Sequence, residues 1–252
     1  MKKWISCILC ILAWTLNAQN EALFERATAD YNEGHYEDAI EKYQKILDNG
    51  KHSAALYYNL GNCYYKLNKI APSIYYYEKG LLLDPTDSEI KNNLAFARNM
   101  ILDDIEPLPQ TGLSRITNRL RGLMTFDQWA YLAIASVLLF VLLYIAYYYL
   151  RYATHKRLAF ILSMVSLFLS CTAVLLAYIQ YHEYEAEQPA IIFAGEVAVK
   201  SEPNNRSQDA FELHEGTKVD VLDELDNWNK IELADGTTGW ILKDKLKMLK
   251  DF

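Results

Sequence analysis

Two apolar segments, each long enough to cross a lipid bilayer, constrain this chain more than any other feature. Residues 128–150 and 158–182 contain no Asp, Glu, Lys or Arg. A helix of about 20 apolar residues spans the hydrocarbon core. A single water-soluble core is therefore excluded, and so is a large polytopic transporter, because most of the remaining chain is polar. We predict transmembrane helices over 129–150 and 158–182.

The short segment 151–157 between the two spans predicts their orientation. It carries Arg151, Lys156 and Arg157, whereas the flank after the second span carries only acidic charges. Basic loops stay in the cytoplasm, so we expect this loop to be cytoplasmic. The apolar stretches 130–150 and 158–181 contain no Asp, Glu, Lys, Arg or His that would mark an ion path,.

The second span contains a stripe of small residues spaced three, four, three and four apart. These residues are Ser163, Ser166, Ser170, Ala173 and Ala177. Helices in lipid associate through close packing over small side chains, so we expect the stripe to face the first span or a partner's span. The alternative is that the serines bond only to carbonyls of their own helix.

The N-terminal segment 1–19 predicts export. Lys2 and Lys3 precede an apolar stretch over 4–16, followed by a plausible processing site at 17–19. This is the pattern of a signal peptide, although an uncleaved signal anchor would look the same. Either interpretation places residue 20 onward outside the cytoplasm. Because the chain then crosses the membrane twice, both soluble parts are expected in the periplasm, held at a bacterial inner membrane.

The composition argues against several functions. The formal net charge of −7 disfavours a nucleic-acid partner,. The five histidines lie far apart, without metal-ligand spacing, and no Cys–His pair suits a peptidase,. Phosphate-binding glycine loops are absent from the sequence,. We therefore expect no catalytic residues, no metal and no cofactor, and a protein that is not an enzyme.

A 34-residue period fills residues 20–102. A shift of 34 aligns Ala27 with Gly61 and Tyr43 with Tyr77, and a further shift places Ala95 at the same small position. The period, the Leu60-Gly61 pair and the closing Pro85 resemble the tetratricopeptide repeat (TPR). The resemblance implies an all-α array of two helix pairs and a closing helix. Small residues at 27, 61 and 95 are expected to let neighbouring helices cross closely.

The resemblance also implies a concave face that binds proteins. The residues expected on it are Phe24, Thr28, Tyr58, Asn59, Asn62, Tyr65 and Asn93. Some members of the family hold a peptide carboxylate with asparagines supported by cations. Here the supporting cations are missing and Glu89 occupies one such place, so we do not expect a carboxylate clamp. A peptide groove of another specificity and a solvated polar groove stay open as alternatives.

Residues 103–128 are expected to connect the repeats to the membrane. The first part is acidic and contains Pro107 and Pro109, which is typical of a stiff linker,. Leucines and arginines alternate over 113–124, as in a basic amphipathic helix on a bilayer surface. A simple lead-in to the first span is the alternative.

Residues 188–252 predict a small β-barrel of five strands. Apolar residues alternate with polar ones around Val197, Val219 and Ile231, and Asp235-Gly236 indicates a hairpin turn,. The segments 213–222, 228–231 and 235–241 together resemble the bacterial SH3 domain. Such domains often bind cell-wall peptides or proteins, and the expected aromatic surface here is Phe193, Phe211, Trp228 and Trp240. The alternative is that Trp228 and Trp240 are partly in the core.

The order of the modules resembles the BatE family, the repeat-containing proteins of the Bacteroides aerotolerance operon. That resemblance implies an inner-membrane complex with von Willebrand factor A-type membrane proteins and a MoxR-type ATPase, and a role in stress tolerance. Two functions compete: a protein–protein scaffold that uses the repeat groove, and a peptidoglycan sensor that uses the SH3-like surface.

Overall fold

The computed structural model describes residues 19–109, 112, 115 and 123–251. The predicted signal segment and most of the basic amphipathic segment 113–124 lie outside this range. The chain forms two compact units. One joins the residues up to Pro107 with those from Gln188 onward, and the other is Leu108–Glu187. The apolar hairpin is thus an insertion between two parts that pack together.

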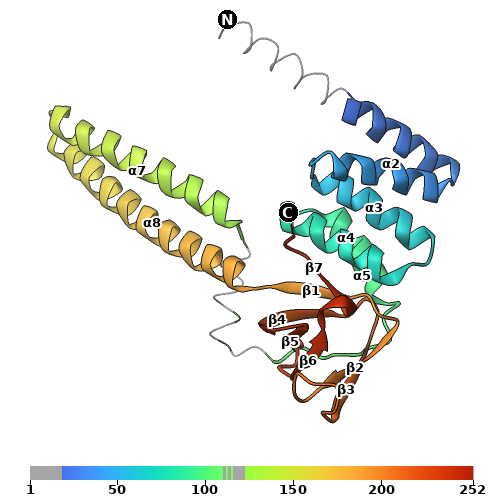
Figure 1. Cartoon of the computed structure of the whole chain (residues 1–252). Coiled ribbons are helices and arrows are strands. Elements are labelled where there is room, and N and C mark those ends of the chain that lie inside the picture. The colour runs from blue at the N-terminus through green and yellow to red at the C-terminus, as the bar shows by residue number, and fades with distance from the viewer. Residues whose placement is uncertain (1–18, 110–111, 113–114, 116–122, 252) are drawn as a thin grey trace, which may run out of the picture. The chain divides into compact units, whose positions relative to one another are not determined.

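The first part of the larger unit is the helical repeat array (Figure 1). A helix over residues 19–33 pairs with α2, and it is followed by a second pair and a closing helix. The labelled helices are α2 (Tyr36–Asp48), α3 (Ala54–Lys66), α4 (Ile70–Leu83) and α5 (Ser88–Arg98). The predicted all-α TPR fold is confirmed.

Local chemistry explains where these helices begin and turn. The Ser53 hydroxyl accepts the backbone N–H of Leu56 at 3.1 Å, and Asp87 accepts the N–H groups of Glu89 and Ile90 at the start of α5. These contacts satisfy N–H groups that a helix start leaves without partners. Asn68 has φ +56° in the turn between α3 and α4.

Tyrosines fill the seams between the helices. Tyr43, Tyr57 and Tyr77 are fully buried or nearly so. A Cβ atom at Gly61 would lie only 2.5 Å from the Tyr77 ring, so this crossing requires glycine. Ala27 is likewise buried. The expectation for the third small position was wrong, because Ala95 is exposed and no further described helix packs on that side of α5.

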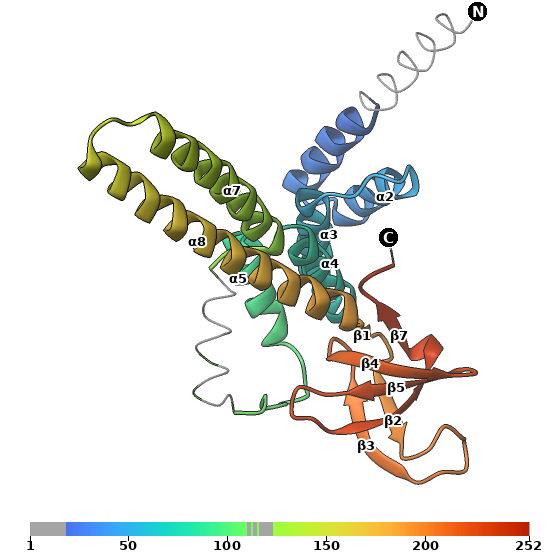
Figure 2. The same ribbon diagram turned by 90° about the vertical axis from the view of Figure 1, so that its left-hand side faces the viewer.

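The second part of the larger unit is an antiparallel sheet in the order β3-β2-β6-β5-β4-β1-β7. Figure 2 shows the strands curled around one core. The strands are β1 (Pro189–Ile192), β2 (Glu196–Lys200), β3 (Asp209–His214), β4 (Lys218–Leu225), β5 (Trp228–Glu232), β6 (Thr238–Leu242) and β7 (Leu246–Met248). Val199, Val219 and Ile231 are buried in the core, as their alternation predicted. The predicted hairpin is confirmed: β5 pairs with β6, and Gly236 has φ +85° in the turn.

The prediction of five strands was wrong, because residues 188–251, which the structure describes, form seven. The alternation rule could not find β1, since all four of its residues are buried. A strand that is covered on both faces reads as a continuous apolar run. The other strand without a clear pattern, β7, is only three residues long.

The smaller unit contains α7 (Phe126–Tyr149) and α8 (Ala153–Ala186), which pack along their lengths (Figures 1 and 2). Both are long and apolar enough to cross a membrane. A capping box starts α7: Thr125 accepts the N–H of Gln128, whose side chain accepts the N–H of Thr125. The predicted loop 151–157 is partly helical, because α8 begins at Ala153. Lys156 and Arg157 are excluded from the hydrocarbon core, but basic residues are compatible with a helix. Their positions therefore do not indicate where α8 begins.

Candidate functional site

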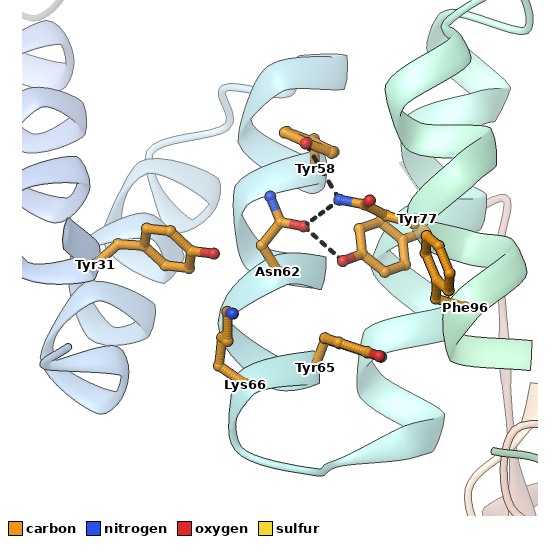
Figure 3. A pocket seen from close by; sticks show the side chains of 8 residues that line it. Tyr31, Tyr58, Asn62, Tyr65, Lys66, Tyr77 and Phe96 are labelled. Atoms are coloured by element: carbon orange, nitrogen blue, oxygen red, sulfur yellow. Dashed lines mark hydrogen bonds between the residues drawn. The ribbon is translucent and has the colours of Figure 1, made fainter. Parts of the chain in front are cut away.

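A pocket of about 200 Å³ lies on the repeat array, with walls from four helices. Its lining residues are Tyr31, Tyr58, Asn62, Tyr65, Lys66, Tyr77, Asn93 and Phe96 (Figure 3). Four of them were expected on the concave face: Tyr58, Asn62, Tyr65 and Asn93. The structure therefore brings together about half of the predicted groove residues and adds four others.

A hydrogen-bond network fixes the middle of the pocket. The Asn62 Oδ1 atom accepts the Tyr77 hydroxyl at 2.6 Å and the Asn93 Nδ2 group at 2.8 Å. The same Nδ2 group donates to the Tyr58 hydroxyl at 3.2 Å (Figure 3). These bonds join α3, α4 and α5, so each side chain is held in one orientation before any ligand arrives. Preorganisation of this kind lowers the entropic cost of binding.

The pocket combines neutral phenols with one cation. Burial raises the pKa of Tyr31 and of Tyr77, so both hydroxyls stay protonated at neutral pH,. Lys66 is exposed and is the one charged residue among the lining residues. Lys66 was not among the expected groove residues, because the supporting cations of the family lie at other positions. Lys66 follows Asn62 by one helical turn, a spacing that could have identified it.

Three predicted groove residues do not line the pocket. Phe24 packs edge-on against the Tyr43 ring, with centroids 5.4 Å apart. Thr28 donates to the Phe24 carbonyl at 2.9 Å, and its hydroxyl lies 2.9 Å from that of Tyr43. Asn59 is half-buried away from the lining. Phe24 and Thr28 therefore hold the first helix against α2, and neither is among the residues that line this pocket.

The four aromatic residues expected on the SH3-like surface do not form one surface. Phe193 packs against Tyr75 of α4, with ring centroids 5.5 Å apart. Phe211 lies on the barrel core, on the same side of β3 as the buried Leu213. Trp228 and Trp240 alone share a face: both are half-buried on the outward side of the β5–β6 hairpin, opposite the buried Ile231.

The outward face of this hairpin mixes aromatic and basic groups. Trp240 lies opposite Lys230 and also opposite Lys200 of β2, while Trp228 lies opposite Leu242. We call Trp228, Lys230, Trp240 and Leu242 the hairpin face. Cross-strand neighbours on one face of a sheet are in contact range, so these side chains form a continuous surface.

The small-residue stripe lies between α7 and α8. Ser163, Ser166, Ser170 and Ala173 are buried, and Ala177 is half-buried. The Ser166 hydroxyl donates to the Ser136 carbonyl at 2.7 Å, and Ser170 donates to the Ala133 carbonyl at 3.1 Å. Ser163 instead donates to Phe160 of its own helix. Bonds between the two helices, at Ser166 and Ser170, and a bond within α8, at Ser163, therefore both occur.

The described residues contain no group of three or more His, Cys, Asp and Glu side chains that could hold a metal ion. The chain combines a helical repeat array, a barrel of the SH3 type and two candidate membrane spans. This architecture places the chain in the class of multidomain proteins with candidate membrane spans.

Comparisons with known proteins agree with this class. Residues 54–87 match the tetratricopeptide repeat family, and residues 195–247 match the bacterial SH3 domain family. Heat shock protein STI1 of Saccharomyces cerevisiae is 34% identical over 76 residues. That match covers 27% of this chain and 13% of the yeast protein, so this chain matches only a small fraction of it.

A solved structure, the TPR2AB-domain:pHSP90-complex of yeast Sti1, aligns with 69% of this chain and 62% of its own. The identity is 16% and the TM-score is 0.31, which is too low to indicate a shared overall fold. The repeat and the SH3 domain are therefore each recognised separately.

Proposed function

We propose that this protein is a membrane-anchored adaptor whose repeat pocket binds a peptide segment of a partner protein. The preorganised network of Asn62, Asn93 and Tyr77 is the observation that carries the proposal. At about 200 Å³ the pocket is smaller than most small-molecule sites, which measure about 300–1,000 Å³,. It has room for one large side chain or one chain terminus of a peptide.

The chemistry of the lining favours a peptide with an acceptor group. The Asn62 side chain uses its oxygen within the network, which leaves its Nδ2 group to donate,. Lys66 adds a positive charge at the edge, and Tyr65 and Phe96 offer aromatic contact. A carbonyl or carboxylate next to an apolar side chain satisfies all of these groups.

The packing of the larger unit supports one side of the membrane for both soluble parts. Residues before Pro107 and after Gln188 form a single compact unit, although the hairpin separates them in sequence. Two crossings return the chain to the side from which it started. The expected export signal and the basic residues between the spans favour the periplasm.

A membrane-impermeant thiol reagent on intact cells tests this orientation. Exposed residues outside the hydrogen-bond networks serve as probes, one in each soluble part: Lys51→Cys and Asn205→Cys. We expect both to be labelled, and Arg151→Cys between the spans to be labelled only after the cells are lysed. Labelling of Arg151→Cys alone in intact cells would reverse the topology.

The BatE resemblance extends this proposal to particular partners. We infer that the pocket serves an inner-membrane complex with von Willebrand factor A-type proteins and a MoxR-type ATPase, linked to aerotolerance. The tetratricopeptide match over residues 54–87 supports the general role, because repeats of this family are typical of protein–protein adaptors.

Photo-crosslinking in native membranes tests the adaptor role. A photoreactive amino acid at Tyr65 in the pocket should capture a protein partner, whereas the same group at Lys51, outside the pocket, should not. The variant Tyr58→Ala, Asn62→Ala, Tyr65→Ala should lose that partner on co-purification and keep its helical circular dichroism. Equal crosslinking from both positions, or unchanged co-purification, would sink the proposal.

The alternative function is binding of peptidoglycan by the SH3-like module. The hairpin face favours it, because the half-buried Trp228 and Trp240 lie on the outward side of the sheet, and Trp240 is opposite Lys230. Aromatic surfaces of this kind bind sugars and peptides. Full-length protein in detergent, mixed with purified sacculi, tests it. Sedimentation with sacculi that Trp240→Ala abolishes and Tyr65→Ala leaves intact would establish the alternative.

A further inference from the structure

The SH3-like module shares an apolar core with the end of the repeat array. Ile191 of β1 and Leu249, which follows β7, are both fully buried among residues of α4 and α5. Phe193 contacts Tyr75 of α4 edge-on, and the Lys247 ammonium lies 4.4 Å from the Phe193 ring centre. Figure 1 shows β1 and β7 next to α4. This contact explains why every residue of β1 is buried.

Two consecutive charged residues of α4, Glu78 and Lys79, each form an ion pair with a residue of the SH3-like module. Glu78 is 7% exposed, and it accepts from Arg98 and from Lys218 Nζ of β4, the latter at 2.9 Å. Lys79 is also 7% exposed and pairs with Asp251 near the C-terminus, which in turn accepts the Tyr75 hydroxyl at 2.7 Å. A buried charge is costly without a paired counter-charge, so removing the partner of Glu78 or Lys79 in the docked state should weaken the contact between α4 and the module.

The segment after α5 also contributes to the contact between the repeat array and the SH3-like module. Asp103 accepts the His214 backbone N–H at 2.8 Å, its ring Nδ1 at 2.7 Å and the Thr217 hydroxyl at 2.6 Å. Ile105 packs on the barrel core. The segment that follows the repeat array in sequence is therefore bound to the SH3-like module, which follows the hairpin.

Gly216 shows how close the two parts are. It lies between β3 and β4 with φ +90°, and a Cβ there would meet Ile70 and Ile74 of α4 at 3.0 Å and Ile101 at 3.3 Å. All three neighbours belong to the repeat part of the chain. Any larger residue at this position would push the module away from α4.

We propose that the SH3-like module is the C-terminal cap of the repeat array and holds the pocket in its binding geometry. Repeat arrays need a terminal element that covers the last apolar surface. In α4, the residues Tyr75, Glu78 and Lys79 contact the module, while Tyr77 contributes its hydroxyl to the pocket network. Undocking the module therefore loosens α4 and α5, which supply Tyr77, Asn93 and Phe96 to the pocket.

If the SH3-like module caps the array, the two modules act as one rigid receptor and not as two modules joined by a tether. The face formed by β1, β7 and the start of β4 is used by the array, and the hairpin face on β5 and β6 stays available. This inference does not depend on what the pocket binds, so it can fail while the adaptor role survives.

Hydrogen exchange of the full-length protein in detergent micelles tests the cap. Lys218→Glu places a second carboxylate beside Glu78, and Lys230→Glu makes the same change on the hairpin face. We expect amides of α4 and α5 to exchange about tenfold faster in Lys218→Glu, the factor that corresponds to about 1.4 kcal/mol. The same amides should be unchanged in Lys230→Glu. Equal protection of α4 and α5 in both variants, with β5 and β6 still protected, would overturn the proposal.

Thermal unfolding provides a second measurement that leaves the contact between the two modules unaltered. Replacing Trp4, Trp14 and Trp129 by Phe leaves Trp228 and Trp240 as the fluorescent tryptophans. We expect their fluorescence and the ellipticity at 222 nm to change at the same temperature, because capped and capping parts unfold together. Two transitions separated by several degrees would show independent modules and refute the cap.

A glycine pair refines this test. Gly216→Ala and Gly236→Ala introduce the same strain at φ +90° and +85°, but only Gly216 faces α4. A helical transition lowered more by Gly216→Ala supports the cap, and equal lowering by both counts against it.

Discussion

The repeat array and the apolar hairpin pack their helices with opposite kinds of side chain. The array buries whole tyrosines, such as Tyr43, Tyr57 and Tyr77. The hairpin buries small residues, such as Ala133, Ser170 and Ala173, and turns its large apolar side chains outward. In water, burial of a large ring removes much apolar surface and stabilises packing. In lipid that drive is weak between helices, and close backbone approach contributes more.

The two regions also satisfy their hydroxyl groups differently. In the array, tyrosine hydroxyls bond to other side chains, as Tyr77 does to Asn62 at 2.6 Å. In the hairpin, serine hydroxyls reach backbone carbonyls of the facing helix, as Ser166 does to Ser136. A long side chain can place its polar end in a pocket, whereas a short one requires the helices to touch. The array therefore produces a binding pocket and the hairpin a close seam.

Removal of a buried ring from the array should have the largest effect. Tyr77→Ala deletes a side chain that is 1% exposed and fills the space over Gly61. We expect it to lower the free energy of unfolding by about 3–5 kcal/mol, as large cavities do. Urea titration followed by ellipticity measures this loss.

Tyr77→Phe is the matched control, because it keeps the ring and removes only the bond to Asn62. Its expected cost is about 1 kcal/mol. If the two variants lose the same stability, the hydroxyl network and not the ring holds the array, and the contrast with the hairpin disappears.

Enlarging a small residue in the hairpin should have the next largest effect. Ser170 is 3% exposed and bonds to the Ala133 carbonyl, so Ser170→Leu forces the helices apart. Overpacking costs about 1–3 kcal/mol. We expect a lower membrane level and a changed complex size on native gels. Leu169→Ala, at a position that is 42% exposed, should leave both unchanged. If Ser170→Leu leaves membrane level and complex size unchanged, close packing of α7 against α8 at this position is not required.

The sequence predicted the features that follow from a simple period. The 34-residue repeat identified the helix pairs, alternation found the β5–β6 hairpin, and the spacing of small residues identified the stripe. Each of these signals is local, because residues at a fixed spacing share one face of one element. About half of the pocket was accessible in the same way, through residues of α3 and Asn93.

The rest depended on contacts between distant segments. Tyr77 reaches the pocket from α4, a helix that was not expected to contribute to the groove. Tyr31 and Phe96 lie one period of 34 from the predicted residues Tyr65 and Asn62, a signal that could have identified both. Phe193 was expected on a ligand surface because it is aromatic, but its partner Tyr75 lies more than 100 positions earlier. The buried pairs of Glu78 and Lys79 likewise need residues from beyond the hairpin. A period within one element carries no information about these pairings.

Removing a single hydroxyl from the hairpin should have a smaller effect. Ser166→Ala deletes the bond to the Ser136 carbonyl across the helices, while Ser163→Ala deletes a bond within α8. Hydrogen bonds between membrane helices contribute about 0.6 kcal/mol on average. We expect Ser166→Ala to weaken the helix pair by about this amount and Ser163→Ala by less, measured by reversible unfolding in bicelles. An equal response would show that packing over small residues, and not the serine bonds, holds the hairpin.

A change in pH should have the smallest effect, and it should act on the larger unit. The hydrogen bond to Asp103 raises the pKa of His214, and Glu196 and Glu212 nearby add to this rise. Burial acts against ionisation of Asp103, yet hydrogen bonds from Thr217 and His214 hold the pKa of Asp103 below its usual value. A histidine with a raised pKa contributes its full stabilisation below about pH 6.5 and loses it as the pH rises through the folded-state value. We therefore expect the melting temperature of the larger unit to fall between pH 6 and pH 8, and to fall less in His214→Gln. Calorimetry of both proteins measures this difference, and a parallel decline in the two would show that His214 is not its source.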